Sequence, residues 1–434
     1  MKLDYKRTFL LGLGFFGISV IWSIYNSYVP PFLREYALPW WLVGFVMTFD
    51  NIAGIVIQPY IGQLSDRTRT RLGRRMPYIL VGAPIAAVFW MLIPVIHLTM
   101  PHVIITLAAL MGVIIVMNIA MAIFRTPTVA LMPDITPSPL RSKANGIINL
   151  MGGLGATLAF LGGAALYKLY PGLPFWVSGA IMLGAEVVVL LVIREPREYY
   201  SREGRAADPR PGFLGTLLQT LRDVGQVIRA PEKSALFIFL AIFTWFVGYN
   251  AIETFWTSYG REVLYAGQIA AGQMTADQAV AKSSGMLTYI SAVFLVFALP
   301  AGFIATRFGR KRTILGGLAI LIVMWLGLYF IHAAFYVIAT LILSGIGWAL
   351  ININSLPIVV DLVSEEKVGS YTGLYYFFSM AAAIVAPPLV GALMDLLGVR
   401  VMFLFTPLFM VLAFLFVWGV RRSEPVAVSG DVPG

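Results

Sequence analysis

Four ionisable side chains stand inside long apolar runs of the sequence: Asp50, Arg125, Glu186 and Glu253. A charged group at the centre of a bilayer costs about 2.5–3.5 kcal/mol on insertion scales, so such residues are kept where they pair, bind a solute or relay protons. The protonation of a buried carboxylate depends on its exposure to water and on nearby cations. These residues are therefore the first candidates for chemistry inside a membrane.

Asp50 has the neighbours of a cavity wall. Gly54 and Gln58 follow it at four and eight residues, so one helix face would carry small and polar groups. Arg125 cannot deprotonate and has to be paired or solvated. We predict that Asp50, Arg125 and Glu253 couple a cation to transport, with Arg125 paired to a carboxylate until a proton releases it toward a substrate. The alternative is a structural Asp–Arg pair that only ties helices together.

Glu253 lies in a segment rich in aromatic and amide side chains. Rings that stack on a sugar, beside amides and carboxylates that bond its hydroxyls, would form a carbohydrate site, although aromatic residues are also common at membrane interfaces. The predicted substrate-binding residues are Asn26, Gln58, Asn118, Arg125, Tyr249, Asn250, Glu253, Trp256, Trp348 and Asn352. For Asn26 and Asn352, bonds to neighbouring helices explain the residue equally well. For Glu186, packing or snorkelling toward the cytoplasm competes with function.

The elements that must position these residues are membrane spans. Of the 434 residues, 59% are hydrophobic and 12% charged, whereas soluble domains carry about 25% charged residues. A crossing needs about 20 apolar residues. The twelve predicted spans run roughly 8–29, 40–64, 77–97, 102–132, 144–169, 174–193, 235–259, 284–306, 312–332, 334–360, 370–394 and 400–420. We expect the first to be a retained span and not a cleaved signal peptide.

The positions of the basic residues indicate the orientation. With the N-terminus inside, 25 of the 31 Lys and Arg fall in inner segments, five fall in outer segments, and Arg125 lies in a span. Basic residues accumulate on the cytoplasmic side of membrane proteins. Both termini are therefore predicted to be cytoplasmic, in an all-α protein of the cell (inner) membrane. This bias accounts for the net charge of +10, so no nucleic acid partner is expected.

The chain is predicted to divide into two six-helix halves. The N-terminal half, a cytoplasmic linker with an amphipathic surface helix, and the C-terminal half are placed at 1–193, 194–234 and 235–434. The halves repeat: "RLGRR" at 71–75 is echoed by "RFGRK" at 307–311, and Asp134 and Asp361 each precede a glycine by twelve residues. Two halves built as parallel repeats are the plan of transporters in which one half rocks against the other.

The stretch "DNIAGIVIQPYIGQLSDRTRTRLGRR", residues 50–75, contains the pattern G-x3-D-R…R-x-G-R-R. That pattern resembles the loop signature of the major facilitator superfamily. The whole stretch is similar to the second-span signature of the sucrose–proton symporters and their relatives among the glycoside–pentoside–hexuronide symporters, and residues 118–153 and 255–267 resemble the fourth and seventh spans of that group. The resemblance implies symport of a sugar or glycoside with H⁺ or, in some members, Na⁺.

A cluster of charges ends the second predicted span. Asp66 can pair with arginines or with a facing helix N-terminus, which favours a conformational role over substrate contact. The predicted cytoplasmic latch comprises Asp66, Arg67, Arg71, Gly73, Arg74, Arg75 and Arg307.

Motifs of enzymes are missing from the sequence. The chain has no cysteine, its three histidines are not in zinc-protease spacing, and it has neither a nucleophile elbow nor a Walker loop. We therefore expect no catalytic residue, metal ligand or cofactor, and a monomer in the lipid bilayer that binds a small solute and a cation. The alternatives are a facilitator or exporter of another amphipathic solute, such as a lysolipid or a drug, and a non-transporting receptor on the same bundle.

Overall fold

The computed structural model describes residues 3–137, 140–195, 213–363 and 367–421. Within these ranges the chain is helical, and only Thr70 and Gly73 form an isolated β-bridge. Twelve helices are long and apolar enough to cross a membrane, so the predicted twelve-span all-α class is confirmed. In hydrocarbon every backbone N–H and C=O must be satisfied within the segment, which is why these apolar runs fold as helices.

The helices before the linker are α1 (Tyr5–Glu35), α2 (Trp40–Val46), α3 (Phe49–Arg67), α4 (Met76–Thr99), α5 (Ile104–Ile135), α6 (Arg141–Leu169) and α7 (Leu173–Val192). The linker contains α8 (Phe213–Arg229). The helices after it are α9 (Ser234–Tyr259), α10 (Ala266–Ala270), α11 (Ala276–Phe308), α12 (Arg310–Phe330), α13 (Ala334–Val360), α14 (Val368–Leu397) and α15 (Met402–Gly419). A π-helical turn, Gly260–Leu264, extends α9.

The second predicted span is divided in the structure. Helix α2 ends at Val46 and α3 begins at Phe49. Thr48 closes the turn, since its N–H and its hydroxyl both donate to the carbonyl oxygen of Phe45, at 3.0 and 2.7 Å. Asp50 consequently lies in the first turn of α3. The helix dipole favours a negative charge at that position.

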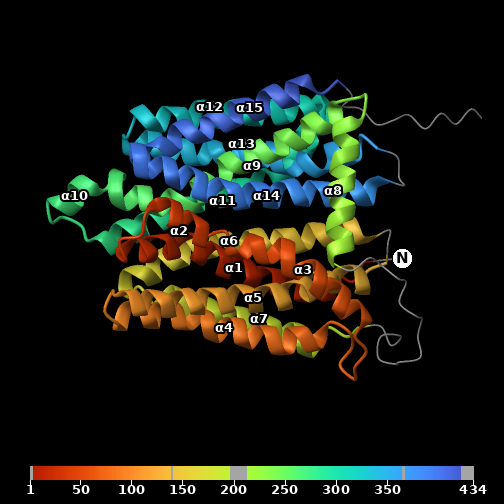
Figure 1. Cartoon of the computed structure of the whole chain (residues 1–434), viewed down its shortest axis with the longest axis horizontal. Helices are drawn as coiled ribbons and strands as arrows, with labels where there is room; N and C mark the ends of the chain where they lie inside the picture. Colours follow the sequence, from red (N-terminus) through yellow and green to blue (C-terminus); the bar gives the residue numbers. More distant parts are fainter. Residues whose placement is uncertain (1–2, 138–139, 196–212, 364–366, 422–434) are drawn as a thin grey trace, which may run out of the picture.

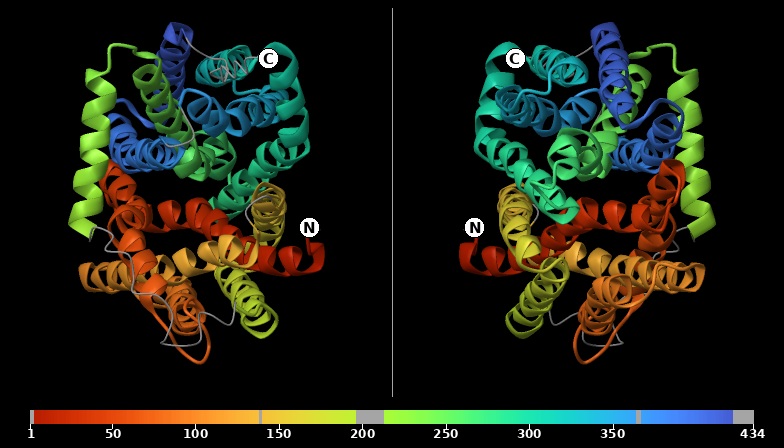
Figure 2. Two further views of the ribbon diagram at one scale, coloured as in Figure 1. Left: turned by 90° about the vertical axis from the view of Figure 1, so that its right-hand side faces the viewer. Right: turned by 90° about the vertical axis from the view of Figure 1, so that its left-hand side faces the viewer.

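The helices gather in two groups. Figure 1 shows α1 to α7 on one side of the molecule and α9 with α12 to α15 on the other, and α8 runs from one group to the other at the end where the N-terminus lies. The end-on views in Figure 2 show the same two groups, with α8 along one flank. We call the end that carries the N-terminus and α8 the terminal side, and the end that carries α10 the far side. The terminal side is the one that the sequence predicts to be cytoplasmic.

The repeat between the two groups extends to their contacts. Arg74 forms an ion pair with Asp134, and Arg310 forms the corresponding ion pair with Asp361. Each arginine follows a glycine with positive φ, +108° in the first group and +86° in the second. Glycine adopts such a φ without a steric penalty. The matching "RLGRR" and "RFGRK" segments therefore perform the same local task, which is to join a loop to the end of a distant helix.

Helix α8 is the amphipathic helix of the linker. Its Asp223 accepts a hydrogen bond from Ser370 of α14 at 2.7 Å, and Val227 is buried against the bundle. Leu221 and Ile228 are exposed on the helix surface. An exposed apolar face on such a helix suits the headgroup region of a membrane.

Candidate functional site

A cavity of about 1250 Å³ lies between the two groups of helices. Its walls come from α1, α3, α5 and α6 on one side and from α9 and α14 on the other, and Thr220 of α8 also lines it. Arg141 and Asn145, at the start of α6, line it on the terminal side. Trp22, Arg125 and Glu253 line it deeper in the bundle. The cavity is large enough for a small solute together with water.

Arg125 faces this cavity beside an aromatic ring. Its guanidinium carbon lies 6.0 Å from the centroid of the Trp22 ring, at the limit of a cation–π contact. Among the described residues Arg125 forms no ion pair within 4.0 Å, but its charge attracts that of Asp50, while Glu253 repels Asp50. Asp50 thus interacts with each of the other two charges without forming an ion pair with Arg125. The separation leaves space in which water or solute hydroxyls can lie between them.

Asp50 lies next to the cavity wall, at the start of α3. Its Oδ1 accepts a hydrogen bond from the Asn51 amide at 2.7 Å, and the residue is only partly buried. Gly54 and Gln58, which follow on the same helix face, line the cavity itself. The i, i+4, i+8 spacing seen in the sequence therefore runs along the wall from Asp50 toward the terminal side.

Glu253 joins the two groups of helices. Its Oε1 accepts a hydrogen bond from Asn26 of α1 at 3.1 Å. A smaller cavity of about 200 Å³ is lined by Glu253 and by the rings of Tyr249 and Trp348. These rings are stacked, with centroids 3.8 Å apart and planes inclined by 7°. The arrangement places an aromatic platform beside a carboxylate and an amide, which are the groups that a carbohydrate site requires.

Five of the predicted substrate-binding residues lie off the walls of both cavities: Asn118, Asn250, Trp256, Asn352 and Asn26, the last of which donates to Glu253. Asn118 and Asn250 donate to the carbonyl one turn earlier in their own helices, at 2.9 and 2.7 Å. Trp256 is fully buried and donates to the carbonyl oxygen of Ser283 at 2.8 Å. Asn352 belongs to neither set of lining residues. In this conformation Asn118, Asn250 and Trp256 donate to backbone carbonyl oxygens of helices, as membrane-buried amides and indoles often do.

The structure also brings polar residues to the cavity that we did not predict from the sequence. Trp22 of α1 and Asn145 and Asn149 of α6 line it, as does Tyr376 of α14. A signal for two of them is present in the sequence. Asn145, Asn149 and Gly153 have the same spacing of four and eight residues that singled out the face of Asp50.

Glu186 is buried away from both cavities. Its side chain is 1% exposed, and neither carboxyl oxygen has a hydrogen-bond partner among the described residues. It packs where α7 meets α1: a Cβ added to Gly14 would lie 3.2 Å from Glu186 Oε1. The side chain does not reach the terminal surface, so it does not snorkel in this conformation.

Polar contacts between the two groups close the far side. The Asp395 carboxylate of α14 accepts hydrogen bonds from the backbone N–H groups of Trp40 and Trp41, at 2.8 and 3.0 Å. It thereby caps the N-terminus of α2, where the helix dipole favours an anion. Glu35 of α1 forms an ion pair with Arg261 at 3.0 Å. Opening the far side would require both contacts to separate.

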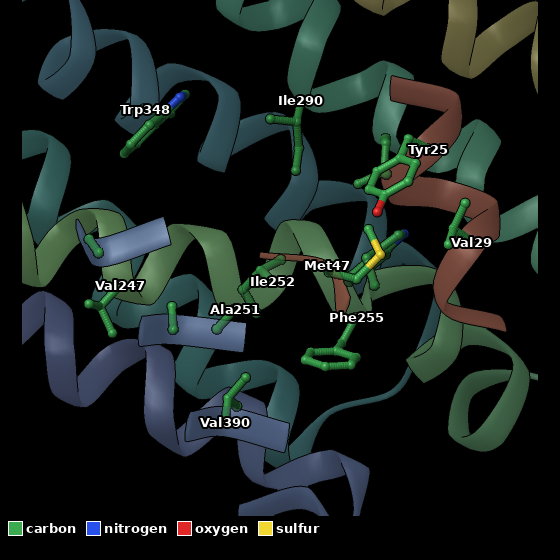
Figure 3. Close-up of a cluster of buried hydrophobic side chains, with 14 of the residues drawn as sticks. Tyr25, Val29, Met47, Val247, Ala251, Ile252, Phe255, Ile290, Trp348 and Val390 are labelled. Atoms are coloured by element: carbon green, nitrogen blue, oxygen red, sulfur yellow. The ribbon is translucent and has the colours of Figure 1, made fainter. Parts of the chain in front are cut away.

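An apolar cluster lies between these polar contacts and the cavity. Figure 3 shows Val29 of α1, Met47 of the turn before α3 and Phe255 of α9 in this cluster. All three are buried, as is Tyr25. A Cβ added to Gly44 of α2 would collide with the backbone of α14, so these helices are in close contact, as small residues allow. The bundle is closed at the far side, and its cavity extends toward the terminal side.

Three residues of the predicted latch, Asp66, Arg74 and Arg75, join a network of charges within the first group of helices. Arg75 pairs with Asp66 and with Asp134, and Arg74 also pairs with Asp134. Glu195, after α7, accepts hydrogen bonds from the backbone N–H groups of Arg74 and Arg75 at 2.9 and 2.8 Å. Asp66 therefore bonds to arginines of its own group. We find no contact from it to a facing helix N-terminus among the described residues.

The other predicted latch residues occupy two kinds of position. Gly73 lies against Glu195, and a Cβ there would approach the Glu195 carboxylate to 2.5 Å, so only glycine fits this turn. Arg67, Arg71 and Arg307 are exposed.

We expect Asp66→Asn to change the rate of transport and not the affinity for substrate. Loss of one charge-assisted hydrogen bond is worth roughly 1.5 kcal/mol, so we expect the exchange rate to shift about tenfold. Asp66 lies at the end of α3, so equilibrium binding should remain within about twofold. The measurement is counterflow rate beside equilibrium binding, with Arg222→Gln, at an exposed residue of α8 outside the latch, as control. Binding weakened tenfold with an unchanged exchange rate would contradict a conformational role.

Twelve spans surround a central cavity, and this cavity extends to one side of the bundle. This architecture is that of a membrane transporter of the major facilitator fold. The chain belongs to the family described as MFS/sugar transport protein, whose profile matches residues 10–400. The resemblance seen in the sequence is thereby confirmed.

Relatives of known name are similar over parts of the chain. The general alpha-glucoside permease of Schizosaccharomyces pombe is 26% identical over 252 residues, which cover 54% of this chain and 45% of the permease. Sucrose transport protein SUT1 of Oryza sativa subsp. japonica is 37% identical over 76 residues, covering 18% of this chain and 14% of the relative. The matched regions thus span less than half the length of either relative.

Solved structures are similar over nearly the whole chain. The nucleoside transporter NupG superposes with a TM-score of 0.72 at 15% identity, covering 97% of this chain and 100% of NupG. A bacterial homologue of the human lysosomal transporter Spinster, in an inward-facing and occupied conformation, superposes with a TM-score of 0.71 at 16% identity, covering 98% of each chain. At these identities the likeness establishes the fold alone.

Proposed function

We propose that the protein is a secondary active transporter that moves a sugar or glycoside together with a cation, with H⁺ as the ion. The observation that carries this proposal is the meeting of Asp50, Arg125 and Glu253 beside the cavity, next to the stacked rings of Tyr249 and Trp348. Arg125 and Asp50 come from one group of helices and Glu253 from the other. A change in the charge of one of these residues therefore alters the electrostatic interaction between the two groups of helices.

The proposed mechanism follows from the charges. When Asp50 is ionised, it attracts Arg125 and opposes Glu253. A proton on Asp50 removes both effects and frees the Arg125 guanidinium to donate to solute hydroxyls, and the solute ring stacks on the aromatic platform. Loss of that proton on the other side of the membrane restores the attraction and helps to expel the solute. Because the carboxylate is in a low-dielectric region, its protonation responds strongly to such neighbours.

The names of the relatives support a sugar as the solute. They are called an alpha-glucoside permease, a sucrose transport protein and, in Homo sapiens, proton-associated sugar transporter A. NupG is called a nucleoside transporter, so a nucleoside is a rival solute, and the other alternative is an amphipathic solute such as a lysolipid or a drug. We further propose a monomer in the cell (inner) membrane with both termini cytoplasmic, two halves at 1–193 and 235–434, and a linker at 194–234.

Counterflow in proteoliposomes tests this function. We expect labelled sugars or glycosides to exchange with saturation, and nucleosides, lysolipids and drugs not to compete. Trp348→Ala should weaken the sugar affinity about tenfold, since it removes one face of aromatic contact worth roughly 1–1.5 kcal/mol. Trp418→Ala, at a residue that is 66% exposed on α15, is the matched control and should leave affinity unchanged. Exchange of a lysolipid or nucleoside that no sugar inhibits would refute the sugar assignment.

A further inference from the structure

Two of the three histidines meet a glutamate on the far side, outside both cavities. His97 lies near the end of α4, His102 lies in the turn before α5, and Glu35 ends α1. The Nε2 atom of His97 is 3.1 Å from Oε2 of Glu35. One side-chain nitrogen or oxygen atom from each of the three residues lies within 4.8 Å of those of the other two. Spacing along the chain does not indicate this cluster, because the histidines are five residues apart and Glu35 is far away in the sequence.

His97 is held rigidly in this cluster. Its side chain is 2% exposed, and its ring stacks on Phe32, with centroids 3.9 Å apart, and on His102, with centroids 4.7 Å apart. Its Nδ1 atom is buried and has no hydrogen-bond partner among the described residues. The contact that closes the far side here needs only the Glu35 carboxylate and Arg261. The Nε2 atom of His102 lies 3.0 Å from the carbonyl oxygen of His97, and neither imidazole takes part in the Glu35–Arg261 ion pair.

We propose that Glu35, His97 and His102 form a binding site for a divalent transition metal ion, with Zn²⁺ as the best fit. Two imidazoles and one carboxylate, with a fourth position left for water, are a known ligand set for Zn²⁺. Bonds of about 2.0–2.1 Å to zinc place tetrahedral ligand atoms about 3.3 Å apart. His102 is exposed and Glu35 is partly exposed, so rotation of these two side chains can close the cluster around an ion.

The site is coupled to the closure of the far side through Glu35. The carboxylate that would bind the metal also holds Arg261, which belongs to the other group of helices. A doubly charged ion and the guanidinium repel each other across Glu35, so each weakens the binding of the other. By linkage, the metal should favour the state in which Arg261 has left Glu35, and loss of Arg261 should tighten metal binding by the same factor.

Zinc titration of the full chain in lipid nanodiscs tests the site without any transport assay. We expect one saturable Zn²⁺ per chain, which Mg²⁺ does not displace because imidazoles disfavour it. His102→Ala should weaken binding at least about tenfold, since it removes one of three ligands. His332→Ala is the matched control and should bind as the wild type does. The chain has no cysteine and only three histidines, so thiolates do not compete for the ion and His332 is the one other imidazole. Weak binding of several ions, equally reduced in both variants, would overturn the proposal.

Removal of the Arg261 charge tests the coupling between metal binding and the Glu35–Arg261 ion pair. Arg261→Gln should tighten Zn²⁺ binding about tenfold, the size expected for charges of +2 and +1 about 6 Å apart in water. Glu35→Gln should abolish the Zn²⁺ binding of both the wild type and the Arg261→Gln variant. An unchanged or weaker affinity in Arg261→Gln would show that the metal and the ion pair do not share Glu35.

Discussion

Asp50→Asn should exchange substrate across a membrane without a gradient and yet fail to accumulate it. The amide mimics a permanently protonated carboxyl, so substrate binding and the movement of the halves remain possible. Coupling of one proton to one solute gives the wild type about tenfold accumulation for each pH unit, because a pH unit is worth about 1.36 kcal/mol. The variant should stop near equal concentrations. The measurement is uptake driven by a pH gradient beside counterflow, in liposomes at one protein density.

Glu186→Gln is the matched control for this prediction. It neutralises the fully buried carboxyl of α7, which lies outside both cavities. We expect it to leave the accumulation ratio unchanged. If Asp50→Asn still accumulates substrate stoichiometrically, Asp50 is not the coupling residue, and Glu253 becomes the first candidate. If Glu186→Gln loses accumulation instead, the proton is carried outside the cavity.

Arg125→Ala should lose both exchange and accumulation. Among the described residues Arg125 is the one arginine at the deep end of the cavity, so the change removes one or two charge-assisted hydrogen bonds to substrate, each worth roughly 1.5–3 kcal/mol. It also leaves Asp50 without the cation that attracts it. We expect counterflow to fall about a hundredfold or more. The measurements are saturable counterflow and equilibrium binding on the same preparation. A loss of binding shows that the variant no longer contacts substrate, and a loss of counterflow with normal binding shows that the conformational change is impaired.

Two further variants distinguish this role from a structural one. Arg141→Ala removes an arginine nearer the terminal end of the same cavity, where it donates to backbone carbonyls at the end of α5, and should retain most of the exchange. A purely structural pair predicts that Asp50→Asn and Arg125→Gln each misfold and that the double variant recovers full activity. Recovery of gradient-driven uptake in the double variant would therefore remove both residues from the mechanism.

Apolar runs and charge bias determine much of this protein by themselves. Hydrocarbon leaves a chain no way to satisfy its backbone except as helices, so run length alone predicted the twelve spans that the structure contains. The short "RLGRR" and "RFGRK" repeats located equivalent loops, because each needs a glycine with positive φ followed by an arginine. Asp50 and Gln58 were placed on one face because the helical period fixes which residues align.

Contacts between distant segments were decided by the tertiary structure alone. Asn118 and Trp256 carry groups suited to a substrate, but in the structure both donate to backbone carbonyl oxygens of helices. Helical periodicity in the sequence does not predict these partners. The second span is divided before Asp50 at Met47 and Thr48. Neither residue type interrupts a helix by itself, so the sequence does not show the division. Glu35 meets His97 and Arg261 because three separate helix ends converge on the far side. Sequence spacing predicts which residues are neighbours within one helix. It does not predict which residues meet where different helices come together.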